Sequence, residues 1–109
     1  MLYKLKYNNE YIIISHKKIY LYPSQKKINI PDIKYPVRII KSNEEYIVFD
    51  YFENYLHFLD KSLKPINKIT YKPSIINDIA SYHDDIIILL DNNNKQIKKI
   101  RDPSRKCLL

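Results

Sequence analysis

The chain has 109 residues, 45% of them hydrophobic, and its 19 lysine and arginine residues outnumber its 12 aspartate and glutamate residues, giving a formal net charge of +7. This length suits one small domain, and this hydrophobic content excludes a wholly disordered chain. No run of about 18 apolar residues is present to span a bilayer. Residues 1–4 are followed by charged residues instead of the apolar segment of a secretory signal. We therefore expect an intracellular, cytoplasmic protein with no membrane partner.

The chain contains no glycine. Phosphate-binding loops of the P-loop and dinucleotide types and the nucleophile elbow of serine hydrolases all require glycine, so enzymes of these classes are excluded. Backbone positions with positive φ must use other residue types, and we expect asparagine and aspartate there. The abundance of Ile, Lys, Asn and Tyr is typical of a very AT-rich genome, that of a virus, an organelle or a parasite, and we expect a viral protein in an infected host cell.

The first part of the chain contains four predicted strands separated by polar turns. Residues 1–7 alternate apolar and basic side chains, as expected of a half-buried strand. Residues 11–15, 19–22 and 27–30 are predicted strands because β-branched and aromatic residues dominate them. A linker with proline at both ends, residues 31–36, then leads to the next unit.

The second part repeats this order more clearly. Its predicted strands are residues 37–41, 45–50, 55–59 and 63–70. Pro65 predicts that the last of these is an edge strand, because proline cannot donate a hydrogen bond to a neighbouring strand. Residues 45–50 form a nearly continuous apolar run, as do 11–15 and 85–90, which predicts interior strands covered on both faces.

The third part has the same order again. Its predicted strands are residues 75–80, 85–90, 95–100 and 106–109. A helix over residues 75–90 is the alternative, since apolar residues recur there near helical spacing. The crowding of β-branched residues and the pair Asn77-Asp78 argue against it.

A strand-turn-strand pattern begins at Glu10, Glu45 and Asp85, so it recurs after 35 and 40 residues. The repeat predicts a single all-β domain made of three four-stranded antiparallel units, at about residues 1–36, 37–74 and 75–109. A small antiparallel β-sandwich or a curved open sheet is the alternative.

Residues 45–50 followed by 54–60 are similar to the second and third strands of a β-propeller blade, and the repeat as a whole resembles the WD-repeat, kelch and NHL families. The Trp-Asp and Gly-His pairs of WD repeats and the double glycines of kelch repeats are absent. The resemblance implies a half propeller. Because propellers close with about four to eight blades, we expect the chain to complete itself as a homodimer, or on a larger partner.

The resemblance also implies a non-enzymatic scaffold that binds a partner protein through its linkers and turns. The expected partner-binding residues are Tyr35, Tyr51, Phe52, Glu53, Tyr71 and Lys72. Tyr51 and Phe52 are the strongest candidates, because aromatic side chains at a turn are typical of binding hot spots. The alternative is that Phe52 folds back over its own hairpin.

The basic charge supports a second hypothesis, a nucleic-acid-binding component in which lysines contact phosphates and bases stack on tyrosines. The residues expected to form this surface are Lys17, Lys18, Tyr20, Tyr22, Lys26, Lys27, Lys98, Lys99 and Arg101. The alternative is that these lysines only protect sheet edges from aggregation. A sugar-binding pocket lined by some of the 11 tyrosines is a third hypothesis.

Catalytic and metal-binding patterns are hard to find. His16, His57 and His83 lack the spacing of metal ligands and are expected on the surface. His83-Asp84-Asp85 is interpreted as a turn, and Cys107 is a lone thiol. We therefore expect no enzymatic activity, no metal and no cofactor.

Overall fold

The computed structural model describes residues 3–71, 75–83, 85–91 and 97–100. These residues form three antiparallel β-sheets, and the only helical element among them is the 3-10 turn η1 (Phe52–Asn54). The predicted all-β class is therefore confirmed. Within the same ranges, no helix has the length and apolar character needed to cross a membrane.

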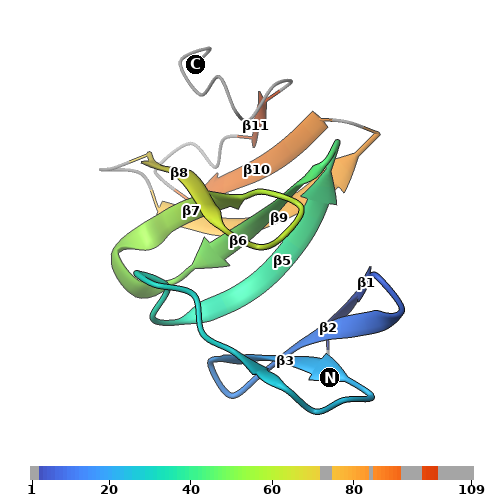
Figure 1. The fold of residues 1–109 in the computed structure, drawn as a ribbon. Coiled ribbons are helices and arrows are strands. Elements are labelled where there is room, and N and C mark those ends of the chain that lie inside the picture. The colour runs from blue at the N-terminus through green and yellow to red at the C-terminus, as the bar shows by residue number, and fades with distance from the viewer. Residues whose placement is uncertain (1–2, 72–74, 84, 92–96, 101–109) are drawn as a thin grey trace.

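Each sheet is built from strands that follow one another in the chain (Figure 1). The first sheet contains β1 (Tyr3–Tyr7), β2 (Glu10–Ser15), β3 (Lys18–Tyr22) and β4 (Lys27–Ile28). The middle sheet contains β5 (Pro36–Ser42), β6 (Glu45–Asp50), β7 (Tyr55–Leu59) and β8 (Pro65–Thr70). The third sheet contains β9 (Ile75–Tyr82), β10 (Asp85–Asp91) and β11 (Ile97–Ile100), with β10 in the centre.

The predicted strands agree with the structure in number and order for the residues that it describes, but not in every bound. The strand predicted at residues 27–30 covers only Lys27–Ile28, and the strand predicted at 63–70 begins at Pro65. The predicted strand at residues 106–109 lies outside the described residues, which therefore form two four-stranded sheets and one three-stranded sheet, not three four-stranded units. The helical alternative for residues 75–90 is wrong, because β9 and β10 pair as antiparallel neighbours with Ile79 opposite Ile88. Their β-branched side chains favour the extended backbone.

The first two strands of each sheet are joined by a two-residue turn whose first residue has a positive φ. These residues are Asn8, Asn43 and His83, with φ of 53°, 56° and 56°. The expectation that asparagine and aspartate would hold all such positions is wrong. The other residue types with positive φ are His16, Lys17, Gln25, Glu53, Leu63 and His83. Strand pairing imposes the turn geometry on whatever residue stands there.

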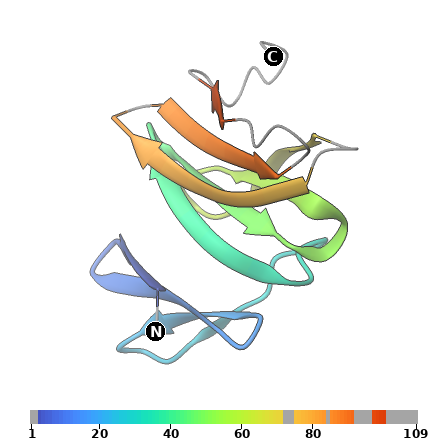
Figure 2. The same ribbon diagram turned by 180° about the vertical axis from the view of Figure 1, so that it is seen from behind.

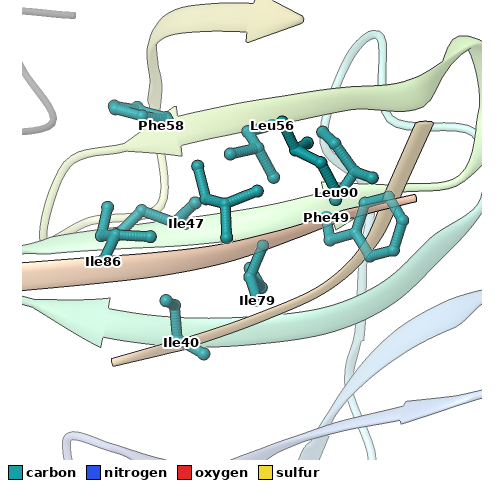
Figure 3. Packing of buried hydrophobic residues seen from close by; sticks show 10 residues of the cluster. Ile40, Ile47, Phe49, Leu56, Phe58, Ile79, Ile86 and Leu90 are labelled. Carbon is teal, nitrogen blue, oxygen red and sulfur yellow. The ribbon is translucent and has the colours of Figure 1, made fainter. Parts of the chain in front are cut away.

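The middle sheet lies between the other two, as both views show (Figure 1 and Figure 2). One buried cluster joins it to the third sheet, and Figure 3 shows these side chains pointing toward one another between the strands. This cluster consists of Ile40, Ile47, Phe49, Leu56, Phe58, Ile76, Ile79, Ile86, Ile88 and Leu90. A second cluster joins the middle sheet to the first sheet. It consists of Ile12, Ile14, Ile19, Leu21, Ile30, Ile39, Tyr46, Val48, Leu59 and Leu63.

The prediction of apolar strands covered on both faces is confirmed only for the middle sheet. Residues 46–50 of β6 are all buried. In the first sheet, by contrast, Tyr11 of β2 is exposed and Ile13 is half-buried, and in the third sheet Leu89 of β10 is exposed. The outer sheets have a neighbouring sheet on one face only within the described structure, so alternate residues of their apolar strands face outward.

The two edges of the middle sheet differ. β8 forms one edge and carries Pro65, which confirms the prediction from that proline. At the other edge, β5 contacts β1 of the first sheet and β9 of the third sheet. The first strands of the three sheets therefore lie next to one another in sequence order.

Candidate functional site

Three exposed aromatic residues gather where the linker into the middle sheet meets the turn between β6 and β7. The rings of Tyr35 and Tyr51 lie 5.5 Å apart in an edge-to-face arrangement. Tyr51 is 59% exposed and Phe52 is 47% exposed. Phe52 therefore does not fold back to become buried over its own hairpin. We call Tyr35, Tyr51, Phe52 and the neighbouring Glu53 the aromatic surface.

The first sheet also reaches this surface. Lys17, in the turn between β2 and β3, places its Nζ atom 4.6 Å from the centre of the Tyr35 ring. This is a cation–π contact, in which the ammonium group is attracted to the electron-rich face of the ring. A turn of the first sheet and a turn of the middle sheet thus meet at Tyr35.

A buried carboxylate holds the backbone beneath the aromatic surface. Asp50, at the end of β6, is 1% exposed. Its Oδ1 accepts hydrogen bonds from the backbone N–H groups of Tyr35 at 2.9 Å and Phe52 at 3.0 Å. Its Oδ2 accepts one from the N–H of Lys34 at 3.1 Å. Two segments that are 15 or more residues apart are therefore fixed to one side chain.

His57 of β7 completes this hydrogen-bonded group. Its Nε2 lies 3.2 Å from Oδ2 of Asp50, and because a carboxylate can only accept, Nε2 is the donor. His57 is 4% exposed, so the prediction of a surface histidine is wrong. Burial lowers the pKa of His57 below its ordinary value, an effect that outweighs the opposing influence of Asp50. The imidazole is neutral at neutral pH.

The remaining predicted partner-binding residues lie elsewhere or outside the described structure. Tyr71 is half-buried and packs against the cluster between the middle and third sheets. Its hydroxyl is buried without a hydrogen-bond partner among the described residues, and burial raises its pKa. Tyr71 thus contributes to the core, not to the aromatic surface. Lys72 lies outside the described residues.

The residues predicted to bind nucleic acid are divided between two sheets. Lys18, Tyr20, Tyr22 and Lys27 lie in the first sheet. Lys17 contacts Tyr35 of the aromatic surface, and Lys26 is exposed in the turn before β4. Lys98 and Lys99 lie on β11 of the third sheet, across the middle sheet, and Arg101 is outside the described residues. The single basic rim expected from the sequence is not formed by the described residues.

Two features of the structure were not predicted from the sequence. Asp50 and His57 were not recognised as a pair, although a histidine within an apolar strand was a signal that it needs a buried partner. Lys4, Lys6 and Tyr11 were not assigned to the basic surface, although the alternation in residues 1–7 placed both lysines on one face. The strand register supplied the missing information.

The two remaining histidines among the described residues lie in turns, apart from His57. Within the described ranges, no three His, Cys, Asp or Glu residues lie close enough to hold a metal ion together. His16 occupies the turn between β2 and β3, and His83 the turn between β9 and β10, where its ring lies 4.4 Å from that of Tyr82. Cys107 lies outside the described residues.

Comparison with known proteins yields no matching family model, no matching curated protein and no matching solved structure.

Proposed function

We propose that the chain is a non-enzymatic protein-interaction module of propeller type, and that it binds a partner protein through its aromatic surface. The observation that carries this proposal is the presentation of Tyr35, Tyr51 and Phe52 by backbone segments that Asp50 holds in place. Exposed aromatic side chains on an ordered backbone are the usual anchors of a protein interface.

Hydrogen bonding to Asp50 matters for affinity because a flexible turn loses conformational entropy when a partner orders it. Asp50 orders the backbone on both sides of the Tyr35–Tyr51 contact before any partner arrives, and the N–H of Tyr51 also donates to the carbonyl oxygen of Tyr35 at 2.9 Å. The entropic cost of binding is then smaller, and more of the contact energy contributes to affinity. The cation–π contact from Lys17 further restricts the Tyr35 ring.

Two features support the propeller-type arrangement. Each sheet is an antiparallel series of consecutive strands, and the first strands β1, β5 and β9 lie side by side. A radial set of blades requires such convergence at one edge of each sheet. The aromatic surface lies on turns and linkers, where the resemblance to propellers placed the partner.

The test compares the partners captured by the wild-type chain with those captured by a Tyr51→Ser/Phe52→Ser variant. Each protein is used to capture partners from extracts of its natural source, and the captured proteins are quantified by mass spectrometry. We expect at least a tenfold loss of one specific partner, because each hot-spot ring typically contributes about 2 kcal/mol or more.

The matched control is Ile66→Ser/Tyr82→Ser, which removes two other exposed hydrophobic side chains from β8 and β9. This variant should keep the partner. The circular dichroism spectrum and the unfolding midpoint of each variant must match those of the wild type. Equal capture by all three proteins, or equal loss with both variants, would refute a role for the aromatic surface.

A further inference from the structure

The outward face of the first sheet is a second surface, distinct from the aromatic surface. Strand alternation places every second residue of β1 to β4 on this face, opposite the buried cluster. Its members are Lys4, Lys6, Tyr11, Ile13, Ser15, Lys18, Tyr20, Tyr22 and Lys27. We call this set the outer face.

The strand register arranges the outer face in rows that cross the sheet. In one row, Lys4 is opposite Ile13, Ile13 is opposite Tyr20, and Tyr20 is opposite Lys27. In the next row, Lys6 is opposite Tyr11, and Tyr11 is opposite Tyr22. Residues that face each other across antiparallel strands share one side of the sheet and have neighbouring side chains.

These rows give the outer face an aromatic centre with lysines at its edges. Lys4 and Lys6 lie on the edge strand β1, and Lys27 lies on the opposite edge strand β4. Tyr20 and Tyr22 lie two residues apart on one strand, or about 7 Å. A shallow depression of about 350 Å³ lies here, lined by Ile13, Ser15, Tyr20, Leu21, Tyr22 and Gln25.

No carboxylate opposes these lysines within the strands of the first sheet. Glu10 is the only acidic residue in β1 to β4. It alternates with Ile12 and Ile14, which face the core, and its Oε1 accepts a hydrogen bond from the backbone N–H of Ser24 at 2.7 Å. The outer face is therefore positively charged, and its complement is an anion.

The outer face also differs from the faces that pack between sheets. Both faces of the middle sheet present Ile, Leu, Val and Phe side chains to their neighbours. Packing another sheet onto the outer face would bury four ammonium groups, those of Lys4, Lys6, Lys18 and Lys27, at a high desolvation cost. A chain of phosphates would instead neutralise them while leaving them partly in water.

We infer that the outer face binds single-stranded nucleic acid, with bases stacked on Tyr11, Tyr20 and Tyr22 and phosphates contacting the lysines at both edges of the sheet. Unpaired bases can stack on exposed aromatic rings, whereas a duplex keeps its bases stacked inside. Tyr22 is 54% exposed and Tyr11 is 42% exposed, so Tyr22 is the most accessible of the three rings. The Nζ atom of Lys4 lies over the Tyr11 ring, 5.2 Å from its centre, so a cation adjoins one face of this stacking platform.

The experiment measures the affinity for a fluorescent single-stranded oligothymidine by fluorescence anisotropy, over a series of salt concentrations. The oligonucleotide has about 16 nucleotides, which is the largest number that one small single-strand-binding domain typically covers. A Tyr20→Leu/Tyr22→Leu variant keeps apolar side chains on the sheet but removes both rings. We expect its affinity to fall by tenfold or more, because each stacked base contributes substantially. The control Tyr82→Leu, on the third sheet, should bind as the wild type does. If the double variant does not fold, Tyr22→Ser alone carries the test, since its side chain is largely exposed.

The lysines are tested by Lys4→Gln/Lys6→Gln. This variant should reduce the slope of log affinity against log salt by about 0.7 for each phosphate that the protein no longer neutralises. The charge-matched control is Lys64→Gln/Lys68→Gln, which removes two exposed lysines before and within β8 of the middle sheet, and it should leave the slope unchanged.

Several results would overturn the inference. Failure of the oligonucleotide to bind, or equal effects of the two lysine variants, would do so. Unchanged affinity after removal of the tyrosine rings would contradict it as well, because the outer face would then attract any polyanion. Tighter binding to a duplex of the same length, or to an acidic peptide, would also overturn it. So would a dimer that dissociates on substitution of Tyr22, because a second copy would then cover the outer face.

Discussion

Asp50 and His57 show how two polar residues can organise a surface from below it. Both are buried, and Asp50 accepts hydrogen bonds from three backbone N–H groups as well as from the imidazole. Each oxygen of this buried carboxylate therefore has hydrogen-bond partners. Asp50 therefore positions the backbone of Tyr35 and Phe52 from beneath the aromatic surface.

This pair predicts a specific dependence of stability on pH. Because burial lowers the pKa of His57 in the folded protein, the unfolded chain binds a proton more readily, near the ordinary value of 6.5. The free energy of unfolding should be highest above about pH 6.5, where His57 is neutral in both the folded and the unfolded chain. It should decrease as the pH falls from there toward the pKa of His57 in the folded protein, by at most about 1.4 kcal/mol per pH unit. Urea unfolding between about pH 7.5 and pH 5 measures it.

The control is His57→Gln, which keeps a hydrogen-bond donor near Asp50 but cannot titrate. Its stability should change much less over the same range. A wild-type protein that becomes more stable as the pH falls would show that Asp50 holds His57 in the charged form.

At the scale of the strand and the turn, the three sheets use one device. Their first two strands meet in a two-residue turn that begins with a residue of positive φ, namely Asn8, Asn43 or His83. Asparagine accepts this backbone conformation more readily than most residues other than glycine. In a chain without glycine, these asparagines set the register of the strands that follow.

Asn43 provides the test of this role. Asn43→Ala should lower the free energy of unfolding by about 1 kcal/mol, because alanine is strained at positive φ. Asn43→Gly should cause little or no loss, since glycine adopts this conformation freely. Chemical denaturation of both variants measures the difference.

Asn29→Ala serves as the control, because Asn29 is exposed and is not among the described residues with positive φ. It should change stability by less than about 0.5 kcal/mol. If Asn43→Ala and Asn43→Gly lose the same stability, the side chain of Asn43 matters and not its backbone conformation.

At the scale of the whole molecule, the end sheets are unlike each other. The outer face of the first sheet carries lysines, whereas β9 and β10 of the third sheet expose Ile75 and Leu89. A closed ring of six sheets would place the lysine-rich outer face against another sheet. If the expected homodimer forms, we therefore propose that it pairs through the third sheet.

Leu89→Lys should convert such a dimer into a monomer, because a charge placed in an apolar interface is left without a partner. Ile66→Lys, on the exposed side of β8, should leave the mass unchanged. Light scattering coupled to gel filtration measures both. A wild-type chain with the mass of one copy would refute the dimer, and a dimer insensitive to Leu89 would refute this interface.

The all-β class and the order of the strands could be predicted from the amino-acid sequence, whereas some strand ends, such as those of β4 and β8, could not. Strand formation depends on local features, namely β-branched and aromatic runs separated by polar turns, and these can be read along the chain. The same local signals identified Tyr51 and Phe52 as exposed aromatic residues and Pro65 as part of an edge strand.

Which residues from different segments meet became clear only from the packing of the sheets. The tertiary structure brought Asp50 to the N–H groups of Lys34 and Tyr35, buried His57, and separated Lys27 from Lys98 by a whole sheet. These outcomes depend on register and on sheet packing, and a shift of one residue in register would turn every side chain of a strand to the opposite face. Composition and periodicity constrain that choice only weakly, because it is made by contacts between residues that are distant in the chain.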